Sequence, residues 1–129
     1  MKKSARPGNR SSSTSHARPA AAGRVRIIGG QFRRTPIRVS VAPGLRPTPD
    51  RVRETLFNWL DHLLGDLSRV RALDLFAGTG ALGFEMASRG ARDVVLVDSS
   101  PRAVAALHEL RLRLAAAAVT VLQLSLIHI

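Results

Sequence analysis

The sequence contains no cysteine and no long apolar run, and its first half has almost no acidic residues. Without cysteine, the chain can form neither disulfides nor thiolate-held metal sites. Its apolar runs are far shorter than the roughly 20 residues of a membrane-spanning helix, and its Ser/Arg-rich start lacks the apolar core of a secretory signal. We therefore expect a soluble, cytoplasmic protein whose 129 residues form one domain, without a membrane partner.

The scarcity of acids makes the charge uneven. Residues 1–53 hold 13 Lys/Arg and one acid, Asp50, whereas residues 54–129 hold 7 Lys/Arg and 8 acids, so the two parts carry +12 and −1. A strongly basic segment beside a nearly neutral one indicates a surface for a polyanion next to a conventional folded domain. Nucleic acid is the polyanion that we expect.

The basic segment divides into two regions. Residues 1–23 lack apolar periodicity, and we expect a disordered basic tail. Residues 24–47 begin with apolar residues before Gly29 and Gly30 and continue with Ile37, Val39 and Val41 in alternation, a pattern that predicts a basic β-hairpin followed by a loop. The candidate RNA-contacting arginines of the hairpin are Arg26, Arg33, Arg34 and Arg38. Such side chains can lie along a phosphate backbone without reading its sequence.

A helix is predicted after Pro43-Gly44. Thr48 is the expected N-cap and Pro49 the first helical residue, and the helix should end near Gly65. Its apolar residues are spaced by three and four and predict one buried face, with Arg51 and Arg53 displayed on the opposite side. The apolar residues of this face are Val52, Leu56, Trp59 or Leu60, and Leu63.

The remainder alternates between strand and helix patterns. Strands are predicted at 71–76, 93–98 and 119–122, with helices at 81–89 and from Ser100-Pro101 to about Leu114. The first strand is a nearly continuous apolar run, as expected where both faces are covered. Short connections in this order predict an α/β fold with a parallel sheet and right-handed crossovers.

A glycine-rich turn follows the first of these strands. Gly78 to Gly83 matches G-x-G-x-x-G, and Asp98 lies 20 residues after Gly78, which is the usual dinucleotide fingerprint. Asp74 argues against a dinucleotide, because two unit charges about 4 Å apart at an effective dielectric near 20 repel by roughly 4 kcal/mol. The cofactor S-adenosylmethionine carries an ammonium and a sulfonium but no phosphate, so the same carboxylate attracts it.

Other roles remain open for individual residues of this turn. Asp98 can accept both ribose hydroxyls of either cofactor, so it does not discriminate between them. Asp74 and Asp98 can also each simply cap the following helix. Phe76, at a buried strand end, is compatible with core packing as well as with the cofactor site.

Four ordered motifs resemble the RsmD family, bacterial enzymes that methylate the exocyclic N2 of a guanine in 16S rRNA. They are Arg26 to Gly30, Gly44 to Thr48, Asp50 to Leu60, and Leu73 to Gly83, and the similarity runs from about Arg24 to Gln123. The resemblance implies a Rossmann-like, S-adenosylmethionine-dependent methyltransferase sheet, preceded by a basic β-hairpin and a helix. The full-length enzyme would be a monomer, with 16S rRNA or the small ribosomal subunit as partner.

The resemblance also implies roles for individual residues. Asp74, Phe76, Gly78 and Gly80 would line the methionine end of the cofactor site, and Asp98 would hold the ribose. By the same resemblance, Arg46, Thr48 and Arg53 lie near the cofactor and the RNA. Thr48 has an equally good explanation as a helix cap, and the arginines can be solvated charges.

The chain departs from the family pattern after its third predicted strand. Relatives have an acid near the adenine and an Asn/Asp-Pro-Pro-aromatic motif that binds the flipped guanine, and neither is present here. No catalytic residue and no metal ligand is therefore assigned in this chain. We expect residues 48–123 to be the N-terminal part of a methyltransferase domain with its first three strands, residues 124–129 to be a non-native tail, and the chain to be inactive.

Truncation would leave the strand at Leu73 to Phe76 without a partner on one side, and we expect aggregation or a molten state. Two other functions remain possible from the sequence. The literal G-x-G-x-x-G is compatible with an NAD-dependent oxidoreductase, and the basic hairpin is compatible with a non-catalytic RNA-binding module.

Overall fold

The computed structural model describes residues 24–39 and 48–128. A two-stranded antiparallel hairpin comes first, and an α/β unit with a three-stranded parallel sheet follows it. The elements are β1 (Arg24–Arg26), β2 (Pro36–Arg38), α1 (Asp50–Leu64), η1 (Leu67–Arg69), β3 (Arg71–Asp74), α2 (Ala81–Ser88), β4 (Asp93–Asp98), α3 (Pro101–Leu114), β5 (Val119–Gln123) and η2 (Leu126–His128). The predicted tail 1–23 and residues 40–47 of the predicted hairpin and loop lie outside the described residues.

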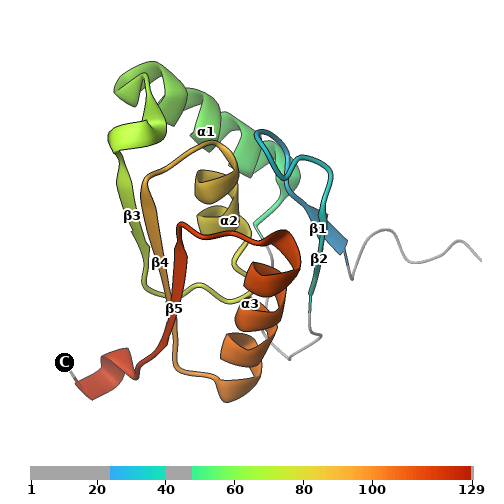
Figure 1. Cartoon of the computed structure of the whole chain (residues 1–129), viewed down its shortest axis with the longest axis vertical. Helices are drawn as coiled ribbons and strands as arrows, with labels where there is room; N and C mark the ends of the chain where they lie inside the picture. Colours follow the sequence, from blue (N-terminus) through green and yellow to red (C-terminus); the bar gives the residue numbers. More distant parts are fainter. Residues whose placement is uncertain (1–23, 40–47, 129) are drawn as a thin grey trace, which may run out of the picture.

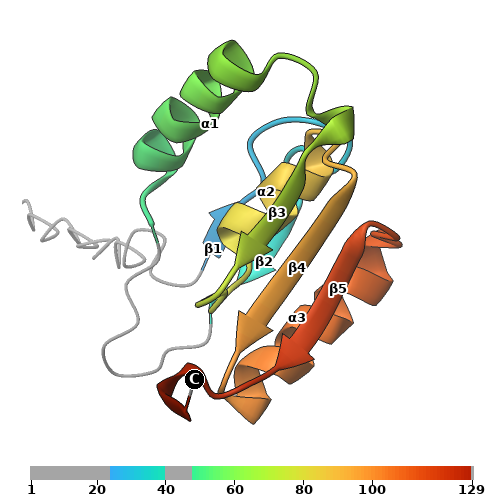
Figure 2. The same cartoon turned by 90° about the vertical axis from the view of Figure 1, so that its left-hand side faces the viewer.

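The parallel sheet has the order β3-β4-β5, which confirms the predicted alternation of strands and helices. Leu73 pairs with Val95 and Leu96 pairs with Val121, so all three strands point the same way. Their carboxyl ends therefore lie at one edge, next to the turn that connects β3 to α2 (Figure 2). Ser100 caps α3 as expected, because its hydroxyl accepts a hydrogen bond from the Ala103 N–H.

The helices α2 and α3 lie on one side of the sheet, and the hairpin lies beyond them (Figure 1). The core fills the space between sheet and helices, where Phe84, Leu96 and Leu107 are almost completely buried. Ile27 of the hairpin and Phe57 of α1 belong to the same core. The hairpin and α1 are thus packed parts of one unit rather than attachments.

The opposite face of the sheet is covered by no described element, as Figure 2 shows. Leu73 is 62% exposed there, and Leu122 is 41% exposed. The prediction that the first parallel strand is covered on both faces is therefore wrong for the described chain. The expectation that this strand has a free edge is confirmed, since among the described strands β3 pairs only with β4.

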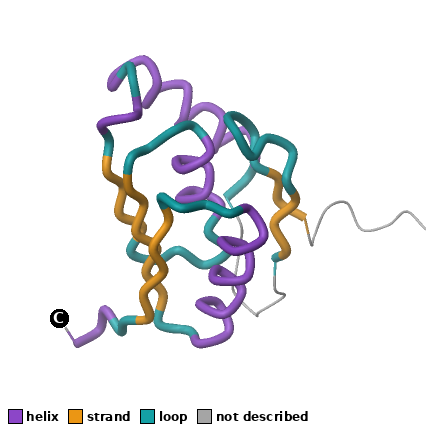
Figure 3. The backbone as a smooth tube through the Cα atoms, viewed as in Figure 1, coloured by secondary structure: helices purple, strands orange, loops and turns teal. Residues whose placement is uncertain are grey.

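The hairpin is held against α2 by side chains of that helix, with the helices lying between hairpin and sheet (Figure 3). The buried carboxylate of Glu85 accepts hydrogen bonds from the N–H groups of Ile28 and Gly29, at 2.8 and 2.9 Å. The Ser88 hydroxyl donates to the Gly29 carbonyl and accepts from the Phe32 N–H. A buried carboxylate thereby satisfies backbone donors at the hairpin turn.

The helix α1 differs from its prediction in two ways. It begins at Asp50 with Pro49 as N-cap, and no side chain caps it, so Thr48 is not the cap. Its predicted apolar face is largely exposed, with Trp59 at 67% and Leu63 at 74%, whereas Phe57 is buried. The Phe57 ring packs under the guanidinium of Arg89, the residue that follows α2, with the guanidinium carbon 5.0 Å from the ring centre.

Arg53 was expected on the solvent side of α1, and that expectation is wrong. Its side chain is fully buried, pairs with Asp50 and donates to the Arg26 carbonyl at 3.0 Å. Its Nη1 also lies 3.9 Å from Glu85. These contacts hold the start of α1 against the hairpin and α2.

Candidate cofactor site and RNA-facing groove

The carboxyl ends of β3 and β4 meet at the glycine turn. Gly78, with φ of 55°, has left-handed backbone, and its N–H donates to Asp98 Oδ2 at 2.9 Å. Asp98 Oδ1 accepts from the Ser100 N–H at 2.9 Å. Asp98, which was predicted to hold the ribose, therefore joins the glycine turn to the end of β4 through hydrogen bonds. An ionised carboxylate that accepts two hydrogen bonds still has free acceptor positions.

Asp74 lies at the end of β3 and is half-buried. It is close enough to Asp98 for the two carboxylates to interact electrostatically. Burial raises the pKa of Asp74 above its ordinary value, and the negative charge of Asp98 adds to this rise, while a hydrogen bond from the Phe76 N–H opposes it. The turn is thus flanked by two carboxylates that repel each other. A cationic ligand would relieve this repulsion and an anionic one would increase it.

The other two glycines of the fingerprint are explained by packing. A Cβ at Gly80 would lie 2.6 Å from Leu107, and one at Gly83 would lie 2.0 Å from Leu96. Two N–H donors of the turn have internal acceptors, since that of Gly80 donates to the Ala77 carbonyl and that of Ala81 donates to the Thr79 hydroxyl. The match to G-x-G-x-x-G therefore needs no pyrophosphate to explain it.

Phe76 follows Asp74 at the end of the strand and is 80% exposed. The core-packing interpretation of this residue is thus wrong for the described chain. An exposed aromatic ring beside the glycine turn is free to contact a ligand there.

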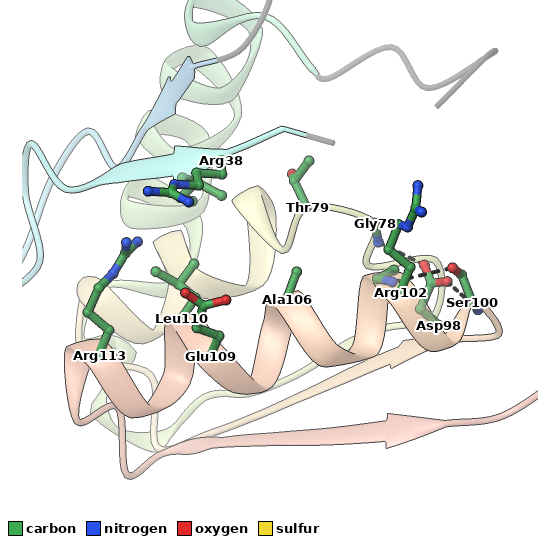
Figure 4. A pocket seen from close by; sticks show the side chains of 12 residues that line it. Arg38, Gly78, Thr79, Asp98, Ser100, Arg102, Ala106, Glu109, Leu110 and Arg113 are labelled. Atoms are coloured by element: carbon green, nitrogen blue, oxygen red, sulfur yellow. Dashed lines mark hydrogen bonds between the residues drawn. The ribbon is translucent and has the colours of Figure 1, made fainter. Parts of the chain in front are cut away.

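A groove of about 320 Å³ begins at the glycine turn and runs between β2 and α3. Figure 4 shows Asp98, Gly78, Ser100 and Arg102 at one end, and Arg38, Glu109 and Arg113 at the other. The lining residues are Ile37, Arg38, Gly78, Thr79, Asp98, Ser100, Arg102, Ala103, Ala106, Glu109, Leu110 and Arg113. The groove connects the candidate cofactor site to the basic hairpin.

The hairpin arginines that were predicted to face RNA are Arg26, Arg33, Arg34 and Arg38, and all four are exposed. Arg46 lies outside the described residues. Among the four, only Arg38 lines the groove.

Sequence reasoning missed the arginines of α3 that line the groove, Arg102 and Arg113. Their spacing contained the signal, because residues eleven positions apart are three turns apart and lie on the same face of a helix. The adjacent small or polar residues of this face, Ala106 and Glu109, also line the groove.

In the described ranges 24–39 and 48–128, no group of three or more His, Asp or Glu side chains could hold a metal ion. No helix in the same ranges has both the length and the apolar character needed to cross a membrane.

Several known proteins are similar to this chain. The small-subunit ribosomal RNA methyltransferase D of Escherichia coli K12 is 52% identical over 79 residues, which are 61% of this chain and 38% of that protein. The protein of the same name from Haemophilus influenzae is 49% identical over 80 residues, 62% of this chain and 40% of that protein. The chain thus spans about two fifths of the length of these curated relatives.

Solved structures share the fold. A structure of an Escherichia coli protein described as a candidate methyltransferase matches with a TM-score of 0.66 at 40% identity, covering 78% of this chain and 52% of that chain. A hypothetical protein of Thermus thermophilus matches with a TM-score of 0.67 at 39% identity, covering 81% and 57%. The predicted Rossmann-like methyltransferase fold is confirmed, with three parallel strands in the described chain.

The sequence profile of the family called conserved hypothetical protein 95 matches residues 25–125. This match begins in the hairpin, ends beyond β5, and includes all the motifs that resemble RsmD. The chain therefore belongs to this family, the RsmD family.

Proposed function

We propose that this chain supplies the S-adenosylmethionine site and an RNA-contacting surface for methylation of the exocyclic N2 of a guanine in 16S rRNA, within the small ribosomal subunit or its precursor in the cytoplasm. One observation carries the proposal: the carboxylates of Asp74 and Asp98 flank a turn whose N–H groups at Gly78 and Gly80 already have internal acceptors. Such a site favours a cationic cofactor without phosphate.

Each end of the cofactor has a partner in this proposal. The free acceptor positions of Asp98 take the ribose hydroxyls, since only one N–H donates to each of its oxygens in the described chain. Asp74 attracts the ammonium and the sulfonium, directly or through water. Phe76 and the backbone of Gly78 and Gly80 line the methionine part.

The RNA surface is formed by exposed hairpin arginines, Arg26, Arg33, Arg34 and Arg38, and by Arg46 from the sequence resemblance. Arg53 is removed from this set because its guanidinium is buried and paired. Guanidiniums on such a ribbon position an RNA backbone and do not read its bases. The names of the relatives, which are ribosomal RNA methyltransferases, support RNA as the substrate.

The reaction is in-line transfer of a methyl group. Bound S-adenosylmethionine would supply the methyl group, whose bond to the sulfonium sulfur would break as its bond to the guanine amino nitrogen forms, with S-adenosylhomocysteine as leaving group and the amine proton passing to solvent. Holding the two reactants in line and away from water supplies most of the rate enhancement in such a reaction. In this chain the residues described contribute cofactor and RNA contacts, and none is assigned to bind the guanine amine.

Calorimetric titration separates this function from the dinucleotide alternative. S-adenosylhomocysteine, the demethylated cofactor, and NAD⁺ are titrated into the 129-residue chain in parallel. We expect heat from S-adenosylhomocysteine alone, and its loss in Asp98→Asn. Tighter binding of NAD⁺ would overturn the proposal, as would unchanged affinity for S-adenosylhomocysteine in Asp98→Asn.

A further inference from the structure

The groove between β2 and α3 is flanked by three arginines that come from two different parts of the fold. Arg38 extends from the hairpin, whereas Arg102 and Arg113 stand on one face of α3 (Figure 4). All three side chains are exposed. The groove therefore has positive charge on both of its walls.

These arginines differ from others in the described chain that have an acidic partner. Arg53, Arg89 and Arg92 each have a carboxylate within 4.0 Å. Arg38, Arg102 and Arg113 have no such partner among the described residues, although Glu109 lines the same groove. Unpaired guanidiniums along a concave surface attract an extended anion.

One contact fixes the far end of the groove. Arg113 Nη2 donates to the Pro36 carbonyl at 3.1 Å, which joins α3 to the hairpin across 77 positions of sequence. The remaining N–H groups of this guanidinium stay available, because arginine has five donors. The hydrogen bond thereby holds Arg113 at this far end of the groove.

We propose that the phosphodiester backbone of a single-stranded RNA segment lies in this groove, held by Arg38 and Arg113 at one end and by Arg102 beside the glycine turn. The proposal rests on the proposed function and deepens it, because it extends the RNA surface from the hairpin onto the methyltransferase domain. RNA bound in this way passes the open end of the cofactor site at Asp98 and Gly78.

The length of the groove favours a polymer over a small anion. Arg102 and Arg113 are eleven residues apart, which corresponds to about 16 Å along a helix axis. A single phosphate or pyrophosphate cannot contact both. Charge-assisted hydrogen bonds from guanidinium to phosphate are short and strong, and Lys substitutes poorly because it lacks the planar fork of donors.

The test measures RNA binding by the full chain, immobilised at low density so that molecules do not meet. A labelled single-stranded oligoribonucleotide is titrated at several salt concentrations against Arg102→Ala, Arg113→Ala and the double variant. Arg92→Ala is the matched control, since Arg92 is exposed at the opposite, N-terminal end of β4. All other arginines, including those of residues 1–23, are left unchanged in every variant.

Each lost phosphate contact should reduce the slope of log affinity against log salt by about 0.7, because single strands release that fraction of a counterion per contact. We expect this reduction in each single variant and about twice it in the double variant, with no change in Arg92→Ala. Arg113→Lys should recover the slope but not the full affinity. An unchanged slope in the double variant, or tight competition by inorganic pyrophosphate, would overturn the groove proposal.

Failure of the groove proposal is distinguishable from failure of the proposed function. S-adenosylhomocysteine is titrated into the same double variant by calorimetry. If the groove proposal alone fails, cofactor binding persists and RNA affinity is insensitive to Arg102 and Arg113. If the proposed function fails, cofactor binding is absent from the unaltered chain as well.

Discussion

The Gly78 N–H donates a hydrogen bond to Asp98 Oδ2 at 2.9 Å, across 20 positions of sequence. This bond joins the turn after β3 to the end of β4, and the other oxygen of the same carboxylate accepts from Ser100. Asp98 therefore shapes the turn before any cofactor binds. The structural and functional explanations of this residue are complementary, because a carboxylate can accept more than two hydrogen bonds.

Replacing Asp98 should cost stability as well as cofactor affinity. Asp98→Ala removes the acceptor for two backbone donors, and hydrogen bonds to charged groups contribute about 1.5 to 3 kcal/mol each. We expect urea unfolding to show a loss in this range or above, with a smaller loss for Asp98→Asn. Asp93→Asn, on the exposed start of β4, is the control and should change the free energy of unfolding by less than about 0.5 kcal/mol. Equal effects at the two positions would contradict this role of Asp98.

Asp74 should make the ligand-free fold less stable as pH rises. Its folded pKa is raised above the ordinary 3.8, so its favourable contribution is complete below 3.8 and is lost as pH increases through the folded value. At neutral pH, Asp74→Asn should be more stable than the unaltered chain but should bind S-adenosylhomocysteine more weakly. Denaturant unfolding across this pH range measures the first effect. Destabilisation by Asp74→Asn at neutral pH would contradict the assignment of the raised Asp74 pKa to burial and to the nearby charge of Asp98.

Glu85 should control the docking of the hairpin. Glu85→Ala leaves the Ile28 and Gly29 N–H groups without their acceptor and removes the buried carboxylate that pairs with Arg89, and breaking a buried charged pair costs about 3 to 5 kcal/mol. We expect rapid hydrogen exchange at both amides and a large loss of stability. Glu54→Ala, exposed on α1, provides the control. Continued protection of both amides in Glu85→Ala would show that other contacts hold the hairpin.

Two glycines with positive φ give a matched pair. Gly30 has φ of 77° and Gly65 has φ of 65°, but a Cβ at Gly30 would lie 1.9 Å from the Ser88 carbonyl oxygen, whereas nothing lies within 4 Å at Gly65. Gly65→Ala should cost only backbone strain, about 1 to 3 kcal/mol, because L side chains rarely adopt its φ of 65° and ψ of −114°. Gly30→Ala should cost clearly more and should undock the hairpin. Equal thermal shifts for the two variants would contradict the close packing of hairpin and α2.

The exposed edge and outer face of β3 should cause self-association. Leu73 and Phe76 present apolar surface beside an unpaired strand edge in the described sheet. We expect sedimentation to show concentration-dependent association, and Leu73→Lys to reduce it, because a charge on an edge strand opposes pairing. A chain that stays monomeric at every concentration tested would contradict this prediction.

The order of strands and helices was predictable because the apolar patterns are local and the caps are clear. Ser100-Pro101 marks the start of α3, and Asp74 and Asp98 end consecutive parallel strands, whose carboxyl ends necessarily meet. The candidate cofactor site follows from that rule alone. The residues of this site are therefore predictable from the sequence, although the hydrogen bond from the Gly78 N–H to Asp98 is not.

Contacts between distant segments could not be predicted in the same way. Glu85 contacts residues 56 and 57 positions away, and no local pattern connects them. A signal did exist, since a single acid in an otherwise apolar helix indicates a buried charge that needs partners. Arg53 misled the prediction for α1 because periodicity places charged residues on the solvent side, whereas Asp50 and Glu85 stabilise this one in the interior.

The most direct test of the central claim locates the ligand at the turn. Amide resonances of the isotopically labelled chain are followed by nuclear magnetic resonance during titration with S-adenosylhomocysteine and, separately, with NAD⁺. We predict that S-adenosylhomocysteine shifts the amide resonances of Gly78, Thr79 and Ser100, and that NAD⁺ leaves these resonances unchanged. Shifts at these amides with NAD⁺, or none with S-adenosylhomocysteine, would contradict a cationic, phosphate-free nucleoside site between Asp74 and Asp98.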